Sequence, residues 1–148
     1  MKYKIGYVPG TFDLFHVGHL NIIKKAKELC EYLICTVSTD ELVLEHKNKK
    51  PVIPFEERIE IVSAIKYVDK AVPQINQDKY LQWQQYKFNA IFVGDDLKNT
   101  PKWLKYEEQL KPCGVDFFYF PYTKSTSSTL ISSTLILETL NKLKRENI

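Results

Sequence analysis

Short apolar runs alternate with longer amphipathic stretches along this chain, and this alternation restricts the possible folds more than any other feature. The runs that we predict as strands cover residues 2–8, 32–37, 68–72, 90–93 and 115–120. The stretches with helical spacing of apolar residues cover residues 17–30, 54–66, 78–86, 102–110 and a last segment from 128 onward. Strands that alternate with helices are typical of a parallel sheet. The sequence therefore predicts an α/β fold: a Rossmann-like, doubly wound parallel sheet of five strands with helices on both faces.

No internal repeat or linker divides the chain. Its 148 residues match the usual size of one domain, so we expect a single domain over residues 1–148. Hydrophobic residues make up 44% and charged residues 26% of the sequence, a balance that excludes disordered and fibrous classes. The stretch from Glu45 to Lys50 is polar and rich in lysine, and we expect a loop there.

The sequence gives no sign of secretion or membrane insertion. The N-terminus lacks the apolar core of a signal peptide, and the longest uncharged apolar stretches, such as 131–137, are too short to span a bilayer. We therefore expect a cytoplasmic protein. Cys30, Cys35 and Cys113 have no paired metal-like spacing and are expected as free thiols. The net charge of +3 is too small to indicate a nucleic acid partner.

The segment after the first strand contains two of the three histidines in the chain. His16 and His19 stand three residues apart at the start of a predicted helix, so both can project to the same side. Helix N-termini favour phosphate, and two imidazole N–H donors would stabilise the charge of a reacting phosphate. Gly10 would let the backbone approach a ligand closely, and Gly18 removes a side chain between the rings.

Two other interpretations of the histidine pair stay open. Paired histidines at helical spacing can bind a metal, although zinc normally needs a third protein ligand, which an Asp would have to supply. A purely structural role is disfavoured, because two of the three histidines and two of the five glycines fall in one short segment directly after a strand. We favour a phosphate site and expect no dedicated metal site in the protein.

The order Gly10-Thr11-Phe12-Asp13 and then His16-Val17-Gly18-His19 resembles the HxGH signature of the nucleotidyltransferase superfamily. The Thr-Phe-Asp form is similar to the cytidylyltransferase branch, especially to the enzymes that act on glycerol 3-phosphate. The likeness continues in order through Ser38 to Glu41, Lys47 to Lys50, Glu57-Arg58, Tyr67 to Asp69, Gly94 to Asp96 and Thr123 to Ile131. It covers nearly the whole chain, which contains neither a Walker-type motif nor a Gly-x-Gly-x-x-Gly motif.

This resemblance implies that a phosphomonoester oxygen attacks the α-phosphorus of CTP and that pyrophosphate is released. His16 and His19 would hold the triphosphate and stabilise the transition state, while Thr11 and Phe12 would contribute backbone contacts to the nucleotide. Magnesium would enter with the triphosphate and bridge its oxygens. The glycines assigned to the nucleotide site are Gly10, Gly18 and Gly94.

Basic side chains complete the site that the resemblance implies. Lys47 and Lys49 match lysines that approach the substrate phosphates in the similar enzymes, although such a lysine run can also be a solvated loop. Arg58 is one of only two arginines among the 21 basic residues. Since a guanidinium offers a planar fork that lysine lacks, we predict that Arg58 contacts a nucleotide phosphate, although it can also pair with a Glu on its own helix.

Four acidic side chains are assigned to the same site. Asp95 and Asp96 follow the fourth strand, which in this winding lies beside the first. Carboxylates repel phosphates, so we expect these two to bind ribose hydroxyls, orient a histidine or make an outer contact to the metal. Asp13 and Asp40 are predicted to bind substrate in the same way, with turn or cap roles as the alternative.

A hydroxyl-rich segment before the last helix resembles the second signature of the family. Its residues predicted to bind the nucleotide are Thr123, Lys124, Ser127 and Ser128; the Ser and Thr side chains can also serve as helix caps. The match is imperfect, because Tyr122 stands where the pattern has Arg, and Lys66 likewise replaces an Arg upstream. Lys124 could supply the missing charge, but only as a point charge without a bidentate fork.

The resemblance also suggests an oligomeric state and an acceptor substrate, and alternatives to this function stay open. The segment from Ile65 to Asp69 resembles one at the subunit interface of similar enzymes, so we expect a homodimer. Glycerol 3-phosphate is the leading acceptor, which would make CDP-glycerol the product. Phosphocholine, phosphoethanolamine or a sugar phosphate are alternative acceptors, an aromatic cage around a quaternary ammonium being the feature that would favour phosphocholine. ATP in place of CTP as the nucleotide is disfavoured. The alternative to an enzyme is a non-catalytic nucleotide-binding protein.

Overall fold

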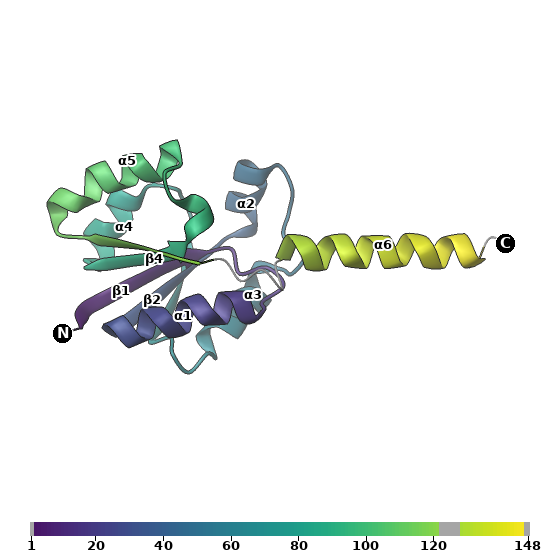
Figure 1. Cartoon of the computed structure of the whole chain (residues 1–148), viewed down its shortest axis with the longest axis horizontal. Helices are drawn as coiled ribbons and strands as arrows, with labels where there is room; N and C mark the ends of the chain where they lie inside the picture. The colour runs from purple at the N-terminus through teal and green to yellow at the C-terminus, as the bar shows by residue number, and fades with distance from the viewer. Residues whose placement is uncertain (1, 122–127, 147–148) are drawn as a thin grey trace.

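A computed structural model describes residues 2–121 and 128–146, and within them five parallel strands form one sheet (Figure 1). The strand order is β3-β2-β1-β4-β5. The strands are β1 (Tyr3–Gly10), β2 (Cys30–Ser38), β3 (Lys70–Gln74), β4 (Ala90–Gly94) and β5 (Asp116–Phe120). The order reverses at β1, whose two neighbours β2 and β4 continue in opposite directions across the sheet. The predicted doubly wound α/β fold is confirmed.

Helices cover both faces of this sheet. The helices are α1 (Val17–Leu29), α2 (Asp40–Lys47), α3 (Phe55–Ser63), α4 (Lys79–Tyr86), α5 (Pro101–Leu110) and α6 (Ser128–Glu146). In Figure 1, α1 and α3 lie on one face, α4 and α5 lie on the other, and α6 extends away from the sheet. Successive residues of β1 point to opposite faces, so Val8 packs with α1 and α3 while Tyr7 packs with α4 and α5.

The helix α2 was missed in the sequence, where residues 45–50 were expected to be a loop. Thr39 caps its first turn by accepting a hydrogen bond from the Leu42 N–H, and two acids lie in that turn. The helix ends at Asn48, whose φ of 57° is left-handed. The expected loop is therefore helical as far as Lys47.

Two further boundaries differ from the sequence prediction. The helix predicted to end near residue 66 ends at Ser63, and the strand predicted over 68–72 is β3 at Lys70–Gln74. The apolar residues in between, Ile65, Tyr67 and Val68, pack against the core from a turn. Apolar residues indicate that a segment is buried, but a buried segment can be a turn as well as a helix or a strand. Periodicity alone does not distinguish a short buried turn from the end of a helix or the start of a strand.

The first strand is longer than predicted and includes the Pro9-Gly10 pair. Its pairing with β2 continues to the end, where Pro9 lies opposite Thr36 and Gly10 opposite Val37. Its pairing with β4 covers Gly6 and Tyr7, so the ladder on that side does not require an N–H from Pro9. Because all strands are parallel, the segments that follow β1, β2, β3 and β4 meet at one edge of the sheet.

Candidate functional site

The two histidines form the N-terminal cap of α1. The Gly18 N–H donates to Nδ1 of His16 at 3.0 Å, and the His16 N–H donates to Nδ1 of His19 at 3.2 Å. This is a capping box built from two imidazoles, whose ring centroids stand 4.0 Å apart. An Nδ1 that accepts a hydrogen bond carries no proton, so each neutral ring has its proton on Nε2. Within the part of the chain that the structure describes, both rings therefore keep an Nε2–H donor for a ligand.

Burial keeps these rings neutral. Desolvation, followed by the charge of His16, lowers the pKa of His19 to about 4, and burial also lowers the pKa of His16. The rings of Phe12 and Phe15 flank His19 at centroid distances of 5.4 and 5.2 Å, which explains its desolvation. At neutral pH the pair therefore offers two neutral donors at the positive end of a helix. This arrangement suits an anion whose charge increases during a reaction.

The loop between β1 and the histidines has an unusual backbone. Phe12 and Leu14 both have left-handed φ values, 55° and 50°, which cost of order 1 kcal/mol or more at each such residue. The Phe12 side chain is buried in the core, and a Cβ at Gly10 would lie 2.9 Å from its ring. The absence of a side chain at Gly10 thus lets Phe12 anchor the loop, while Thr11 lines a cavity described below.

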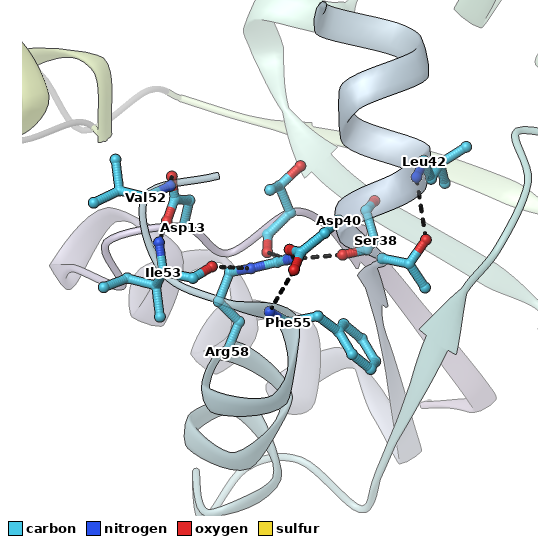
Figure 2. A network of polar contacts seen from close by, with 10 residues as sticks. Asp13, Ser38, Asp40, Leu42, Val52, Ile53, Phe55 and Arg58 are labelled. Carbon is cyan, nitrogen blue, oxygen red and sulfur yellow. Dashed lines mark hydrogen bonds and ion pairs between the residues drawn. The ribbon is translucent and has the colours of Figure 1, made fainter. Parts of the chain in front are cut away.

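Arg58 lies beneath the site, contrary to the prediction of a phosphate contact. Its side chain is only 1% exposed. It donates to the carbonyls of Thr11 (2.6 Å), Ser38 (2.8 Å) and Ile53 (2.9 Å) and to the Asp40 carboxylate (2.6 Å), as Figure 2 shows in part. These bonds use four of its five N–H groups. Arg58 therefore joins the ends of β1 and β2 to α2 and α3.

Asp13 and Asp40 are held by backbone N–H groups in the same network (Figure 2). Asp13 accepts from Val52 at 2.8 Å and from Ile53 at 2.9 Å. Asp40 accepts from Phe55 at 3.3 Å in addition to its ion pair with Arg58. Both were predicted to bind substrate, which stays a prediction; the structure shows them fixing the segment that leads into α3. The turn and cap alternative fits these contacts.

The acids after β4 lie at the exposed edge of the sheet. Asp95 and Asp96 begin a short 3₁₀ helix and are both exposed. A Cβ at Gly94 would lie 2.7 Å from Oδ1 of Asp96, so the glycine makes room for this carboxylate. Since β4 lies beside β1, these oxygens and the histidines belong to the same edge, as predicted.

A cavity of about 330 Å³ opens at this edge on the side of α4 and α5. Thr11 lines it from the end of β1, and its cationic or titratable lining residues are His46, Lys47, Lys79 and Lys102. No Asp or Glu is among the lining residues that the structure describes. Of the two lysines predicted to bind phosphate, Lys47 lines the cavity. Lys49 is exposed beyond the end of α2 and is not among the lining residues.

The sequence analysis missed Lys79 and Lys102. Both lie in the first turn of a helix that follows a strand, where acids are usually favoured over bases. A lysine in such a turn at the carboxyl edge of a parallel sheet is a signal for an anion site that could have been used. The predicted residues Thr123, Lys124 and Ser127 lie outside the described residues, and Ser128 begins α6.

Comparison with models of known protein families identifies the family of this chain. The model of the family described as cytidylyltransferase-like matches residues 7–139. The chain belongs to this cytidylyltransferase-like family. It is an enzyme of the nucleotidyltransferase type, as the resemblance in the HxGH segment implied.

Two curated relatives with different activities are similar to this family member. The glycerol-3-phosphate cytidylyltransferase of Bacillus subtilis (strain 168) is 35% identical over 136 residues, which cover 91% of this chain and 98% of the relative. The FAD synthase of Pyrococcus abyssi is 48% identical over 118 residues, which cover 78% of each chain. The fold is also that of a lipopolysaccharide core biosynthesis protein from Thermoplasma volcanium, at a TM-score of 0.67 and 22% identity over 82% of this chain and 97% of that one.

The part of the chain that the structure describes contains no helix long and apolar enough to cross a membrane.

Proposed function

We propose that this enzyme transfers CMP from CTP to an alcohol phosphate, with glycerol 3-phosphate as the leading acceptor and CDP-glycerol as the product. The observation that carries the proposal is the pair of neutral imidazoles at the N-terminus of α1, next to a cationic cavity; within residues 2–121 and 128–146 their Nε2–H donors have no hydrogen-bond partner and can serve a ligand. The relative from Bacillus subtilis supports glycerol 3-phosphate as the acceptor over most of the chain.

In the proposed reaction a phosphate oxygen of the acceptor attacks the α-phosphorus of CTP. The new P–O bond forms as the bond to the pyrophosphate oxygen breaks, and its electron pair leaves with pyrophosphate. No protein nucleophile is needed, so the enzyme acts by positioning and by stabilising charge. His16 and His19 would donate from Nε2 to oxygens whose negative charge grows in the transition state.

Mg²⁺ is expected to accompany the triphosphate. When bound, it would neutralise charge on the phosphate oxygens. Carboxylate oxygens are the protein ligands that Mg²⁺ prefers, and the exposed Asp95 and Asp96 at the end of β4 offer them on the strand beside β1. These two residues therefore fit a contact to the metal, directly or through water.

We expect the acceptor to bind in the cavity on the side of α4 and α5. It reaches Thr11 at the end of β1, and Lys47 supplies a cation at its rim from the end of α2. An acceptor phosphate held there would stand at the same strand end as the nucleotide site. Homodimer formation and a cytoplasmic location stay predictions.

A second candidate is the synthesis of FAD, which joins AMP from ATP to flavin mononucleotide. The specific observation in its favour is the 48% identity to the Pyrococcus abyssi enzyme. The chemistry at the histidines would be the same, because both reactions move a nucleotidyl group to a phosphomonoester. The two candidates differ in the nucleotide and in the organic group of the acceptor.

Measurement of pyrophosphate release tests both candidates. The purified protein is incubated with Mg²⁺ and either CTP or ATP, in the presence of glycerol 3-phosphate, phosphocholine, a sugar phosphate or flavin mononucleotide. We expect turnover with CTP and glycerol 3-phosphate. Turnover only with ATP and flavin mononucleotide would select the second candidate, and CTP binding without turnover of any pair would select a non-catalytic nucleotide-binding protein.

A further inference from the structure

Gln74, the last residue of β3, is a buried amide that lines the cavity. Its side chain is only 5% exposed. It lies on the same side of the sheet as Val72, two residues before it, which belongs to the apolar cluster beneath α4 and α5. A buried amide in such surroundings costs free energy unless its oxygen and its nitrogen find hydrogen-bond partners. The partners of Gln74 therefore indicate what this amide can bind.

One hydrogen bond determines which end of the amide faces the cavity. The buried Thr36 hydroxyl, on the neighbouring strand β2, donates to Gln74 Oε1 at 3.0 Å. The backbone is held as well, because the Thr39 N–H donates to the Gln74 carbonyl at 3.1 Å. Since its oxygen is turned toward Thr36, Gln74 presents Nε2 and two N–H donors to the cavity.

Nε2 of Gln74 has no hydrogen-bond partner in residues 2–121 or 128–146. Of the fully buried polar side-chain atoms in these residues, only the Tyr119 hydroxyl lacks a partner. Nε2 is not among those atoms, so it keeps some exposed surface, which opens on the cavity that Gln74 lines. An unpaired donor held in place at a cavity wall is typical of a group that orients a ligand.

The position of Gln74 in the cavity separates it from the cationic groups. The lining lysines, Lys47, Lys79 and Lys102, all come from helices. The strand ends contribute neutral polar groups, namely Ser38 at the end of β2 and Gln74 opposite it in the register of β3. An ammonium group suits a phosphate, whereas a neutral amide donor suits an uncharged oxygen. Gln74 is therefore matched to the organic group of an acceptor.

We propose that Gln74 determines specificity for polyol phosphates by donating from Nε2 to a hydroxyl oxygen on the carbon chain of the acceptor. This inference rests on the proposed function, but not on the choice between its two candidates. Glycerol 3-phosphate and the ribityl phosphate part of flavin mononucleotide both carry hydroxyl groups on the chain next to the phosphate. Phosphocholine and phosphoethanolamine carry none, so they would leave the Gln74 donor unpaired, and a site built to bind a hydroxyl group rejects such analogues.

Gln74→Met is the decisive variant, because methionine keeps the length of the side chain without the amide. Calorimetric titration with glycerol 3-phosphate and with n-propyl phosphate, which has three carbons and no hydroxyl group, measures the affinity for each. We expect the parent protein to bind glycerol 3-phosphate about 10-fold more tightly, the effect of one hydrogen bond between uncharged groups. In Gln74→Met this preference should fall to about twofold or less. Flavin mononucleotide is titrated as a third ligand, and whichever polyol phosphate binds the parent protein should be the one weakened.

Two further variants show that the effect belongs to the oriented amide. Thr36→Val removes the hydroxyl that holds Gln74 Oε1, so it should lose part of the preference and add little when combined with Gln74→Met. Gln84→Met makes the same substitution at an exposed position of α4 and should leave the preference unchanged. A general loosening of the fold would weaken the binding of n-propyl phosphate as much as that of glycerol 3-phosphate.

The outcomes distinguish this inference from the proposed function. A preference for a polyol phosphate that depends on Gln74 supports the inference even if neither CTP nor ATP releases pyrophosphate. Turnover of glycerol 3-phosphate with a KM that Gln74→Met leaves unchanged overturns the inference and leaves the proposed function intact. Equal weakening of all the phosphates in Gln74→Met, or a parent protein that binds no polyol phosphate more tightly than n-propyl phosphate, also overturns it.

Discussion

Each histidine at the start of α1 uses its two ring nitrogens differently. Nδ1 of His16 and of His19 accepts a backbone hydrogen bond of the capping box, so it determines the ring orientation and the tautomer. Nε2 is the nitrogen that remains to donate to a phosphate. Caps of this kind contribute about 0.5–2 kcal/mol to stability, whereas transition-state donors act on rate. The two effects can therefore be measured separately.

Replacement of His16 by the two amides tests this division. The amide oxygen of Asn stands near the position of Nδ1, so His16→Asn should keep the cap and lose the Nε2–H donor. We expect its Tm to stay within a few degrees of the parent protein while kcat falls about 10²–10³-fold, the usual cost of losing an oxyanion donor. Thermal unfolding and steady-state pyrophosphate release are the two measurements.

The remaining variants of His16 serve as controls. His16→Gln places an amide N–H closer to the position of Nε2 and should recover part of the rate with a weaker cap. His16→Ala should lose both the cap and the rate. Full activity in His16→Asn would contradict a role for Nε2 in the reaction.

Among the elements, α2 and α3 are joined to the ends of β1 and β2 by the hydrogen bonds of one side chain, in addition to their apolar packing. Arg58, in α3, reaches carbonyls after β1 and at the end of β2 and pairs with Asp40 of α2. The carbonyl of Thr11 belongs to the loop that leads to the histidines. Arg58 is thus a positioning residue, because its hydrogen bonds fix the loop after β1 and the end of β2, which border the site.

Arg58→Lys tests this role while keeping the charge. A lysine has one terminal nitrogen and cannot reach three carbonyls and a carboxylate together. Loss of a buried, bonded partner costs about 3–5 kcal/mol, and in a chain of this size each kcal/mol lowers Tm by about 2–4 °C. Thermal unfolding should therefore show a Tm lower by about 6–20 °C.

The matched control is the other arginine of the chain. Arg145 is exposed near the end of α6, so Arg145→Lys should leave the Tm unchanged. An unchanged Tm in Arg58→Lys would show that the buried network contributes little. Asp40→Asn should lower the Tm less when combined with Arg58→Lys than it does alone, because both act in one network.

The sequence predicts most elements because their apolar residues follow regular periods. The five strands and the order of helices could be derived from patterning, and so could the proximity of β4 to β1. The helix α2 was missed because only Leu42 and Val43 of its eight residues are buried, and its polar second half has the composition of a loop.

The roles of particular side chains were harder to predict. The rarity of arginine indicated that Arg58 is important, but not that it is buried, because its partners lie 5 to 47 residues away in the sequence. Lys79 and Lys102 come from different helices and meet only through the packing of α4 beside α5. Local sequence contains no information on such distances, whereas the histidine pair is local and was found.

At the scale of the whole molecule, the end of β1 borders both candidate binding regions. The histidines follow it at the start of α1, on one side of the sheet, and the cationic cavity opens on the side of α4 and α5. Thr11 lines the cavity and lies five residues before His16. A nucleotide and an acceptor bound to these two regions would therefore meet at one strand end, as an in-line attack requires.

The other feature of the whole molecule is the aliphatic surface of α6. The helix extends away from the sheet (Figure 1), and five large aliphatic side chains are between 50% and 60% exposed: Leu135, Ile136, Leu137, Leu140 and Leu143. The segment that sequence analysis assigned to a dimer interface, 65–69, is partly used within the chain, where Tyr67 packs on the core and Asp69 pairs with Lys27.

We therefore expect the predicted homodimer to form through α6. An aliphatic helix face is complementary to its own copy across a two-fold axis, which is the commonest symmetry of soluble oligomers. Light scattering after gel filtration should give twice the chain mass of 17.4 kDa. Leu137→Glu combined with Leu143→Glu should give the monomer mass, because it places charges in the apolar interface.

The control for this experiment uses polar positions of the same helix. Ser133→Glu combined with Asn141→Glu adds the same charge at exposed polar sites and should leave the dimer intact. A monomeric parent protein would contradict the prediction of a homodimer. A dimer that survives the leucine substitutions would place the interface elsewhere.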